Sequence, residues 1–413
     1  MDMASKPAAA PVAEQASSKR APLFGFPQFA FKRPLGFKDV IDSRATFRLV
    51  FPAKEASSKS VAWLPTPRHA LGFLHFLTRV EEKSILSRAL ARCSCFAVWV
   101  VGCACARIPI NASSSAKPKS NSEPLPLVLL SHGLSGSRHS YMLLASRLAA
   151  KGNAVVVMEH RDGSASTWDD PQSRKLRLYE FSDGTRSWRY SQLQQRHDEC
   201  NAALKILGKM NRGVCETHDA ARHFENFVNC ENFLVAGHSF GSLTALKLAI
   251  ERGCPIAGLD PWMVGLSQGD DQDSRADADW QRAKSLENPA VFVVSDKWDV
   301  TLPKTNERNN DYINAMVQGC QNSALVRVDG VKHVWASDLP AVTRMLDRKN
   351  NNITEANLAH AATVEAILCA SSSHGGDESH DGVNVKHSVR ERIDTIITQQ
   401  PEYSDFMTTI DSC

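Results

Sequence analysis

The sequence predicts an α/β fold in which a mostly parallel central sheet carries helices on both faces. Between residues 126 and 330, short apolar runs typical of buried strands alternate with longer segments of helical periodicity. Strands that alternate with helices of this length imply parallel pairing through right-handed crossovers. With 413 residues, of which 43% are hydrophobic and 23% charged, the chain is long enough to bury the core of such a fold.

The N-terminal part is expected to supply two strands and an amphipathic helix. The segment ATFRLVFPA, from Ala45, alternates as a strand does, and SVAWLP is its expected partner. Between Ala70 and Trp99, apolar residues recur at intervals of three and four, as an amphipathic helix requires. This helix either packs on the core or lies at a lipid interface with its Leu, Phe and Trp side chains inserted.

The apolar run FAVWVVGCACA lies within a cluster of four cysteines, Cys93, Cys95, Cys103 and Cys105. Such a cluster suggests a zinc site or S-palmitoylation, but the spacing is irregular and no histidine lies close by to complete a usual zinc set. We therefore expect no metal. The run of about eleven residues is too short to span a bilayer.

The ordered core begins at Pro126. PLVLLSHG is typical of a strand buried on both faces, YMLLASRLAAKG of a helix closed by Gly152, and NAVVVMEH of the next strand. The alternation continues with the helix QLQQRHDECNAALKILGKM, the strand NFLVAGHS, the helix FGSLTALKLAIERG and the strand PIAGLD. Two further strands, PAVFVVSDKWD and SALVRVDG, enclose a helical segment.

Charge and cysteine content exclude several classes of protein. The net charge of +3 lacks the basic excess of a nucleic-acid-binding domain, and 11 scattered cysteines do not form a disulfide framework. The first twenty residues lack the features of a secretory signal, and Asp2 stands where N-myristoylation needs glycine. We expect a cytoplasmic protein, with peripheral membrane attachment left open.

The pentapeptide GHSFG, residues 237–241, matches the G-x-S-x-G pattern of a nucleophile elbow. It follows the apolar run NFLVA and opens the helical run SLTALKLAI, so the strand–turn–helix context is present. Gly237 and Gly241 lack the side chains that would collide at such a tight turn. We therefore predict Ser239 as a nucleophile and the fold as an α/β-hydrolase.

A serine nucleophile needs a base and an acid that orients the base. In this fold the histidine follows the last strand, and His333 lies about five residues beyond ALVRV. Asp260 ends the strand PIAGLD, whereas Asp296 and Asp299 follow the next strand, and all three preserve the chain order serine, acid, histidine. The pattern alone leaves the acid open.

The oxyanion formed during acyl transfer needs two backbone N–H donors. One belongs to the residue after the nucleophile, Phe240, and the other to the glycine-containing loop SHGLSGS, where Leu134 is the expected donor. Each donor typically contributes about 3 to 4 kcal/mol of transition-state stabilisation.

Several segments together resemble the platelet-activating factor acetylhydrolase family. The matching stretches cover most of residues 125–340 and include SHGL, EHRDGSAS, GHSFG, LDPWM and VDGVKHVWASD. In that family the acid lies in an LDAWM-like sequence, so the resemblance implies Asp260 as the acid, with Ser239 as nucleophile, His333 as base and Leu134 and Phe240 as oxyanion donors. We interpret His160 and Arg161 of the EHRD match as structural, since a buried strand end often needs such hydrogen bonds.

The resemblance implies a calcium-independent esterase that removes acetyl or short oxidised acyl groups from the sn-2 position of glycerophospholipids (a 1-alkyl-2-acetylglycerophosphocholine esterase), without metal or organic cofactor. Family members reach phospholipid at membrane or lipoprotein-like surfaces through amphipathic helices, and the segment Val80–Phe96 occupies the corresponding place. The alternatives are a general lipase or carboxylesterase, and a catalytically silent α/β-hydrolase that serves as a binding module.

The resulting division of the chain has four parts. Residues 1–30 form a disordered N-terminal arm, and residues 31–122 hold strands, amphipathic helices and a linker that belong to the catalytic domain. Residues 123–345 form the α/β-hydrolase catalytic core, and residues 346–413 a C-terminal helical extension.

Overall fold

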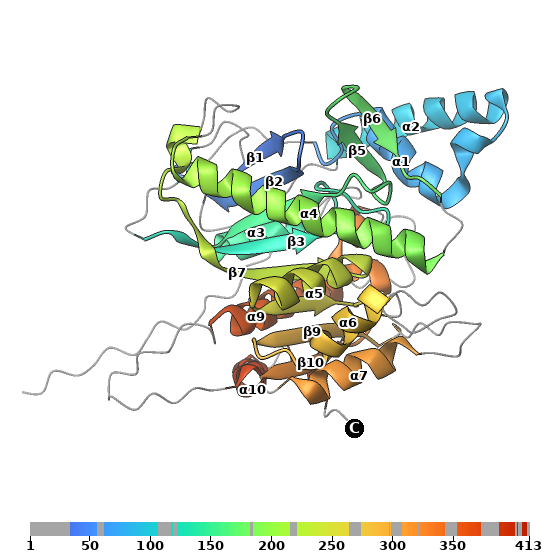
Figure 1. Ribbon diagram of the computed structural model, residues 1–413. Coiled ribbons are helices and arrows are strands. Elements are labelled where there is room, and N and C mark those ends of the chain that lie inside the picture. Colours follow the sequence, from blue (N-terminus) through green and yellow to red (C-terminus); the bar gives the residue numbers. More distant parts are fainter. Residues whose placement is uncertain are drawn as a thin grey trace, which may run out of the picture.

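The computed structural model is shown in Figure 1. It describes residues 34–55, 62–105, 117–118, 123–181, 185–214, 221–263, 274–296, 298, 308–320, 322–342, 353–372, 388–400, 403 and 407–410.

A nine-stranded sheet forms the centre of the molecule, with the strand order β1-β2-β4-β3-β7-β8-β9-β10-β11. The six strands from β4 to β10 in this order pair in parallel, while β1, β2 and β11 add antiparallel edges. The predicted mostly parallel sheet is therefore confirmed. The strands are β1 (Leu35–Ile41), β2 (Thr46–Pro52), β3 (Leu125–Ser131), β4 (Ala154–Glu159), β7 (Val228–His238), β8 (Ile256–Leu259), β9 (Ala290–Ser295), β10 (Ser323–Val328) and β11 (Met407–Ile410).

Helices cover both faces of the sheet because its central strands carry buried apolar side chains on both sides. In β3, Leu127 and Leu129 point into one core, and Val128 and Leu130 into the other. The first core is closed by α4 (Arg186–Asn211), α5 (Phe240–Arg252), α6 (Ser274–Ala283) and α7 (Asn309–Gly319). The second core is closed by α3 (Met142–Ala150), α9 (Ile353–Ser372) and α10 (Val389–Gln399).

The strand predicted from Ala45 is β2, but the prediction that SVAWLP is its partner strand was wrong. The partner strand is β1, which joins β2 through a short turn closed by the hydrogen bond from Asp42 N to Ala45 O (3.0 Å). Trp63 of SVAWLP instead packs with Leu64, Phe73 and Leu339 in a small separate cluster. The two edges of β2 are taken by β1, which joins it through the short turn of residues 42–45, and by β4, so no edge is left for SVAWLP.

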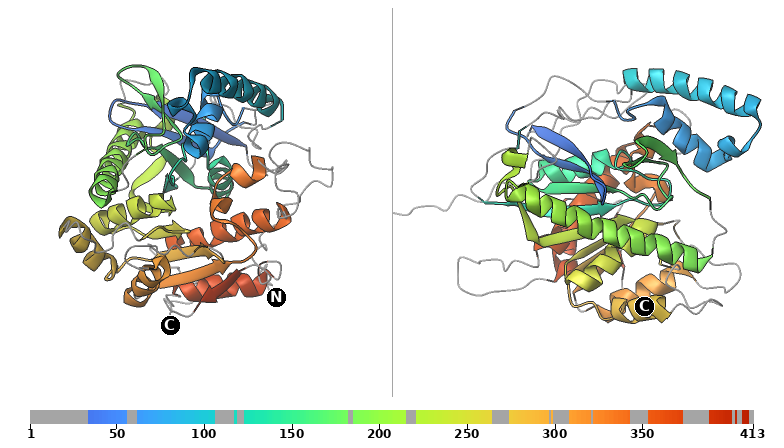
Figure 2. Two further views of the ribbon diagram at one scale, coloured as in Figure 1. Left: turned by 90° about the vertical axis from the view of Figure 1, so that its right-hand side faces the viewer. Right: turned by 45° about the horizontal axis from the view of Figure 1, so that its top comes forward.

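The predicted amphipathic helix is divided into α1 (Pro67–Thr78) and α2 (Ile85–Cys105), with the short 3₁₀ helix η1 (Val80–Glu82) between them. Arg79 ends α1 in a left-handed conformation with φ of 51°, and its guanidinium lies 4.2 Å from the ring centre of Phe181. The two helices pack against each other through Leu71, Val80, Ala91 and Cys95. Both views in Figure 2 place α1 and α2 at the periphery.

The hairpin of β5 (Thr167–Asp170) and β6 (Lys175–Leu178) contacts α1 and is separate from the main sheet.

The region expected as a C-terminal helical extension contributes α9 and α10 to the second core and adds β11 beside β10. Among the described residues, no helix combines the length and apolar character needed to cross a membrane.

Candidate active site

Ser239 stands at the sharp turn between β7 and α5. Its backbone has φ of 55° and ψ of −122°, a conformation that typically costs a non-glycine residue about 1–3 kcal/mol. The surrounding backbone fixes this turn: Ser239 N donates to Leu259 O (2.9 Å), and Ser239 O accepts from Ser242 N (2.9 Å). The side chain is 8% exposed, at the end of the strand where this fold presents its nucleophile.

The two elbow glycines are required by close approach of the backbone. A Cβ on Gly237 would lie 2.2 Å from Gly241 O, and one on Gly241 would lie 2.2 Å from Ser131 O. Both distances are far below any normal contact, so only glycine fits where the elbow crosses the end of β3.

Asp260 follows β8 and is completely buried. Its carboxylate accepts hydrogen bonds from Ser295 N (2.6 Å), Ser295 Oγ (2.9 Å) and Trp335 Nε1 (3.0 Å), and Oδ2 lies 3.3 Å from His333 Nδ1. A carboxylate at this position accepts the Nδ1 proton of His333 and leaves Nε2 as the ring atom that can take a proton from a serine.

His333 is the first residue of the 3₁₀ helix η4 (His333–Ala336), which follows β10. Its ring stacks on Trp298 with ring centres 3.4 Å apart and an angle of 6°. Trp298 is held in turn by a hydrogen bond from Nε1 to Pro261 O (3.1 Å), next to Asp260. The imidazole is thus oriented by an aromatic face as well as by the carboxylate.

The hydrogen bonds of the described residues do not include one between the Ser239 hydroxyl and His333. The rings of His333 and of His238, which adjoins Ser239 in the chain, have centres 4.8 Å apart, so the base lies close to the elbow. In the absence of substrate, such catalytic hydrogen bonds are often long and shorten only in the complex.

His238, the variable residue in the G-x-S of the elbow, connects the base to the loop after β3. Its Nε2 lies 2.8 Å from His333 O and its Nδ1 2.8 Å from Tyr141 Oη, which accepts from Gly133 N (3.1 Å). Burial and the neighbouring His333 hold the pKa of His238 well below its usual range, so the neutral ring donates from Nε2 and accepts at Nδ1. Sequence reasoning missed Tyr141, His238, Ser295, Trp298 and Trp335.

The two expected oxyanion donors lie on either side of the nucleophile. Phe240 is the first residue of α5, where a backbone N–H has no acceptor within the helix. Leu134 is partly buried in the turn after β3. A Cβ on the preceding residue, Gly133, would lie 3.0 Å from the Ser239 Cβ, which places this turn directly beside the nucleophile.

A family model described as "Platelet-activating factor acetylhydrolase, isoform II" matches residues 28–381. The chain belongs to this family. Curated relatives named platelet-activating factor acetylhydrolase include those of Gallus gallus, 28% identical over 63% of this chain and 62% of the relative, and of Canis lupus familiaris, 27% identical over 62% and 56%. The chain thus spans about three fifths of the length of these relatives.

Among solved structures, a ferulic acid esterase from Streptomyces cinnamoneus covers 92% of this chain and 98% of its own, with a TM-score of 0.55 and 17% identity. A likeness at this identity shows the fold alone, and it supports the α/β-hydrolase architecture. The resemblance to the acetylhydrolase family is confirmed by the family match and the relatives.

The other two candidate acids of this acetylhydrolase-family chain differ from Asp260. Asp296 is exposed, and its backbone N donates to Val328 O (3.1 Å). Asp299 lies outside the described residues. Of the two described candidates, Asp260 is the one in contact with His333.

Two groups of residues carry possible metal ligands. Ligand atoms of His238, Asp260 and His333 lie within 4.8 Å of one another, but both nitrogens of His238, Nδ1 of His333 and the carboxylate are hydrogen-bonded as described above. In the cysteine cluster, Cys93 is exposed and Cys95 is buried, on opposite sides of α2, and the side chains of Cys103 and Cys105 lie outside the description.

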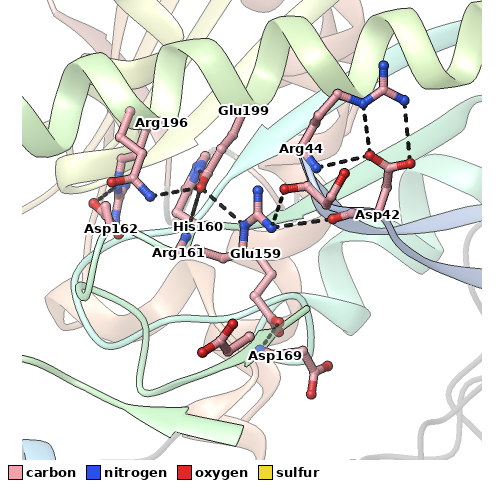
Figure 3. Close-up of polar contacts among 12 residues, drawn as sticks. Asp42, Arg44, Glu159, His160, Arg161, Asp162, Asp169, Arg196 and Glu199 are labelled. Carbon is pink, nitrogen blue, oxygen red and sulfur yellow. Dashed lines mark hydrogen bonds and ion pairs between the residues drawn. The ribbon is translucent and has the colours of Figure 1, made fainter. Parts of the chain in front are cut away.

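His160 and Arg161, which follow β4, both hydrogen-bond to other parts of the chain; the bonds of His160 are buried, and those of Arg161 are partly buried or exposed. His160 Nε2 lies 2.8 Å from Ser131 Oγ, and Nδ1 lies 2.9 Å from Glu199 Oε2 of α4 (Figure 3). Arg161 Nη1 donates to the carbonyls of Asp42 and Ser43. A polar groove of about 740 Å³ borders this cluster, and its lining does not include the elbow or the Asp260–His333 pair.

Proposed function

We propose that this chain is a calcium-independent serine esterase that hydrolyses the sn-2 acetyl or short oxidised acyl ester of platelet-activating factor-like glycerophospholipids. The observation that carries the proposal is the contact of the buried Asp260 with the partly exposed His333, beside the strained Ser239 elbow. The names of the relatives support the choice of lipid substrate.

In the proposed mechanism, His333 Nε2 takes the proton of Ser239 as Oγ attacks the ester carbonyl carbon. Asp260 accepts a hydrogen bond from the Nδ1–H of His333 and stabilises the imidazolium that forms. The N–H groups of Leu134 and Phe240 donate to the oxyanion. Collapse of the tetrahedral intermediate breaks the bond to the lyso-lipid oxygen, which receives the proton from His333. Water then repeats the sequence on the acyl-serine and releases the free acid.

The test is hydrolysis of a 1-alkyl-2-acetyl glycerophosphocholine in the presence of EDTA, together with labelling by a fluorophosphonate probe. We expect turnover and labelling in the wild-type chain and the loss of both in Ser239→Ala. Ser285→Ala, at an exposed position in a turn after α6, is the matched control and is expected to behave as wild type.

Three outcomes would contradict the proposal in different ways. Preference for long-chain triglycerides or nitrophenyl esters over the acetyl phospholipid would identify a general lipase or carboxylesterase. The absence of both labelling and turnover in a folded wild-type chain would identify a catalytically silent binding module. Labelling that persists in Ser239→Ala would place the nucleophile elsewhere.

We further propose that α2 attaches the enzyme to the phospholipid surface that holds its substrate. Leu86, Leu90 and Phe96 are 70%, 61% and 54% exposed and share one side of the helix, whereas Ala91 and Cys95 on the other side pack toward α1. An exposed apolar side of this kind is typical of helices that lie in the membrane interface.

The double variant Leu86→Ser/Leu90→Ser is expected to bind phosphatidylcholine vesicles about tenfold or more weakly. The reason is that a leucine side chain that becomes fully buried in the lipid contributes about 1.5–3 kcal/mol to binding. Vesicle sedimentation measures this effect, and hydrolysis of a soluble nitrophenyl ester should stay within about twofold of wild type, since α2 contributes no residue to the site. Val214→Ser removes an exposed apolar residue after α4 and serves as the control. Equal vesicle binding by all three chains would show that α2 is not the attachment surface.

A further inference from the structure

Arg196, in the middle of α4, is a completely buried cation that contacts the loops after β3 and β4 and the ring of Phe240 at the nucleophile elbow. Its Nε donates to Asp162 Oδ2 (2.8 Å), its Nη1 to His132 O (2.8 Å) and its Nη2 to Ser164 Oγ (2.5 Å). Figure 3 shows the side chain reaching from α4 toward Asp162. One guanidinium thus binds three separate groups on the loops after β3 and β4.

These contacts fix the backbone both before and after Leu134 in the chain. On one side, His132 O accepts directly from Arg196. On the other, Ser135 N donates to Ser164 O (2.8 Å), and Ser164 is the residue whose hydroxyl accepts from Arg196. Ser135 has a left-handed φ of 60°, an unfavourable conformation for a non-glycine residue that a surrounding network must maintain.

The same guanidinium also contacts the side chain of Phe240, whose backbone N–H is the second expected oxyanion donor. The carbon at its centre lies 4.4 Å from the ring centre of Phe240, within the range of a cation–π contact. Trp262 packs on this ring with the ring centres 5.6 Å apart. Phe240 is therefore enclosed between Arg196 and Trp262 at the first residue of α5.

Asp162 keeps this buried cation in place. Burial by itself would raise the pKa of Asp162, but Arg196 and the hydrogen bonds from Ser164 and Arg196 bring the pKa below its usual value, so the carboxylate is ionised. Asp162 Oδ1 also accepts from Ser164 N (3.1 Å) and from the Ser164 hydroxyl. A buried ion pair whose remaining donors are satisfied in this way specifies one arrangement of its neighbours.

We propose that Arg196 is a positioning residue that sets the Leu134 and Phe240 N–H groups at the spacing an oxyanion requires. The inference rests on the proposed function, because it assumes that these two groups are the donors. Only a planar, forked cation can bind Asp162, His132 O and Ser164 together while stacking on Phe240. Lysine preserves the charge that Asp162 needs but cannot make these contacts at the same time.

The test compares p-nitrophenyl acetate with p-nitrophenyl thionoacetate, in which sulfur replaces the carbonyl oxygen. Sulfur is larger and accepts hydrogen bonds weakly, so an intact pair of donors favours the oxygen ester. The ratio of kcat/KM for the two substrates therefore reports the donor geometry, and it does not depend on how much of a preparation is folded.

We expect Arg196→Lys to lower the oxygen-to-sulfur ratio by about tenfold, mostly through kcat of the oxygen ester, since displacement of reacting groups by about 1 Å can cost 10²-fold. Ser164→Ala removes the acceptor of Nη2 and the hydroxyl that donates to Asp162 Oδ1, but it keeps the ion pair between Arg196 and Asp162. It is expected to shift the ratio in the same direction by about two- to fivefold, the effect of one typical hydrogen bond, and it decides the question if Arg196→Lys does not fold.

Arg48→Lys is the matched control. Arg48 is a buried arginine that binds Asp39 through two hydrogen bonds of 2.7 Å and lies 4.3 Å from the ring centre of Phe37, but it contacts neither oxyanion donor. The oxygen-to-sulfur ratio of kcat/KM in Arg48→Lys should match that of wild type even if the thermal stability of the variant falls.

The outcomes separate this inference from the proposed function. A ratio that is unchanged in both Arg196→Lys and Ser164→Ala, or lowered equally in Arg48→Lys, would show that Arg196 is only a stabilising residue, while the esterase assignment would stand. If the wild-type chain hydrolysed neither these two esters nor the acetyl phospholipid, the proposed function would fail and this inference with it.

Discussion

Asp260→Asn is expected to lower kcat for ester hydrolysis by about 10³- to 10⁴-fold with little change in KM. The Asp260 carboxylate accepts bonds from four donors, among them His333 Nδ1 and Trp335 Nε1. The oxygen of asparagine can still accept from Ser295 N, but the amide then presents N–H groups toward Trp335 and His333. Two donors would face each other, so His333 would take the other tautomer, with the proton on Nε2, and could not accept the Ser239 proton.

Asp296→Asn is the matched control for the acid. Asp296 is exposed and its backbone N–H donates to Val328 O, so the kcat of the variant should stay within about twofold of wild type. Steady-state kinetics with p-nitrophenyl acetate and thermal unfolding of both variants make the comparison. Near-normal rates in Asp260→Asn, with a large loss in Asp296→Asn or in Asp299→Asn, would show that Asp260 is not the acid.

Gly241→Ala is expected to abolish activity, with a loss of at least about 10²-fold, and to destabilise the fold by about 3 kcal/mol or more. The added Cβ would lie 2.2 Å from Ser131 O and 2.7 Å from His132 O. Both oxygens belong to backbone, which cannot rotate aside as a side chain can. Helix α5 would have to move away from the end of β3, and the donors Phe240 and Leu134 would separate with it.

Gly208→Ala tests the same substitution where space is available. Gly208 lies in α4, and the nearest atom to an added Cβ is Arg212 Nη1 at 3.6 Å. Because alanine is the better helix former, this variant should be about 0.5–1 kcal/mol more stable than wild type. Urea unfolding of both variants measures the difference, and equal stability of the two would contradict the steric explanation of the elbow glycine.

Much of the core could be predicted because the signals are local. Stretches of β3, β4, β7 and β9, such as residues 127–130 and 233–236, are apolar at successive positions, which is a direct consequence of burial on both faces of a parallel sheet. The elbow could also be located from a short segment, since Ser239 and its two glycines must be adjacent in the chain for the turn to form. His333 could be placed by its position after β10, which depends only on chain order.

Interactions between distant segments could not be predicted from patterns of this kind. The division of α1 from α2 depends on Arg79 and its contact with Phe181, about a hundred residues away in the chain. The partners of β2 depend on the strand order of the sheet, in which β1 and β4 occupy its two edges, and alternation of apolar residues does not contain this order.

The sequence by itself determined the order of strands and helices, the strained serine between two glycines, and the set of candidate acids and base. The tertiary structure placed Asp260, which the pattern left open and the family resemblance implied, against His333, and it alone brought Arg196 into contact with the loops after β3 and β4 and with the ring of Phe240. The physical reason is that periodicity and turn chemistry act over a few residues, whereas an ion pair or a hydrogen bond to a distant loop depends on how the folded layers pack.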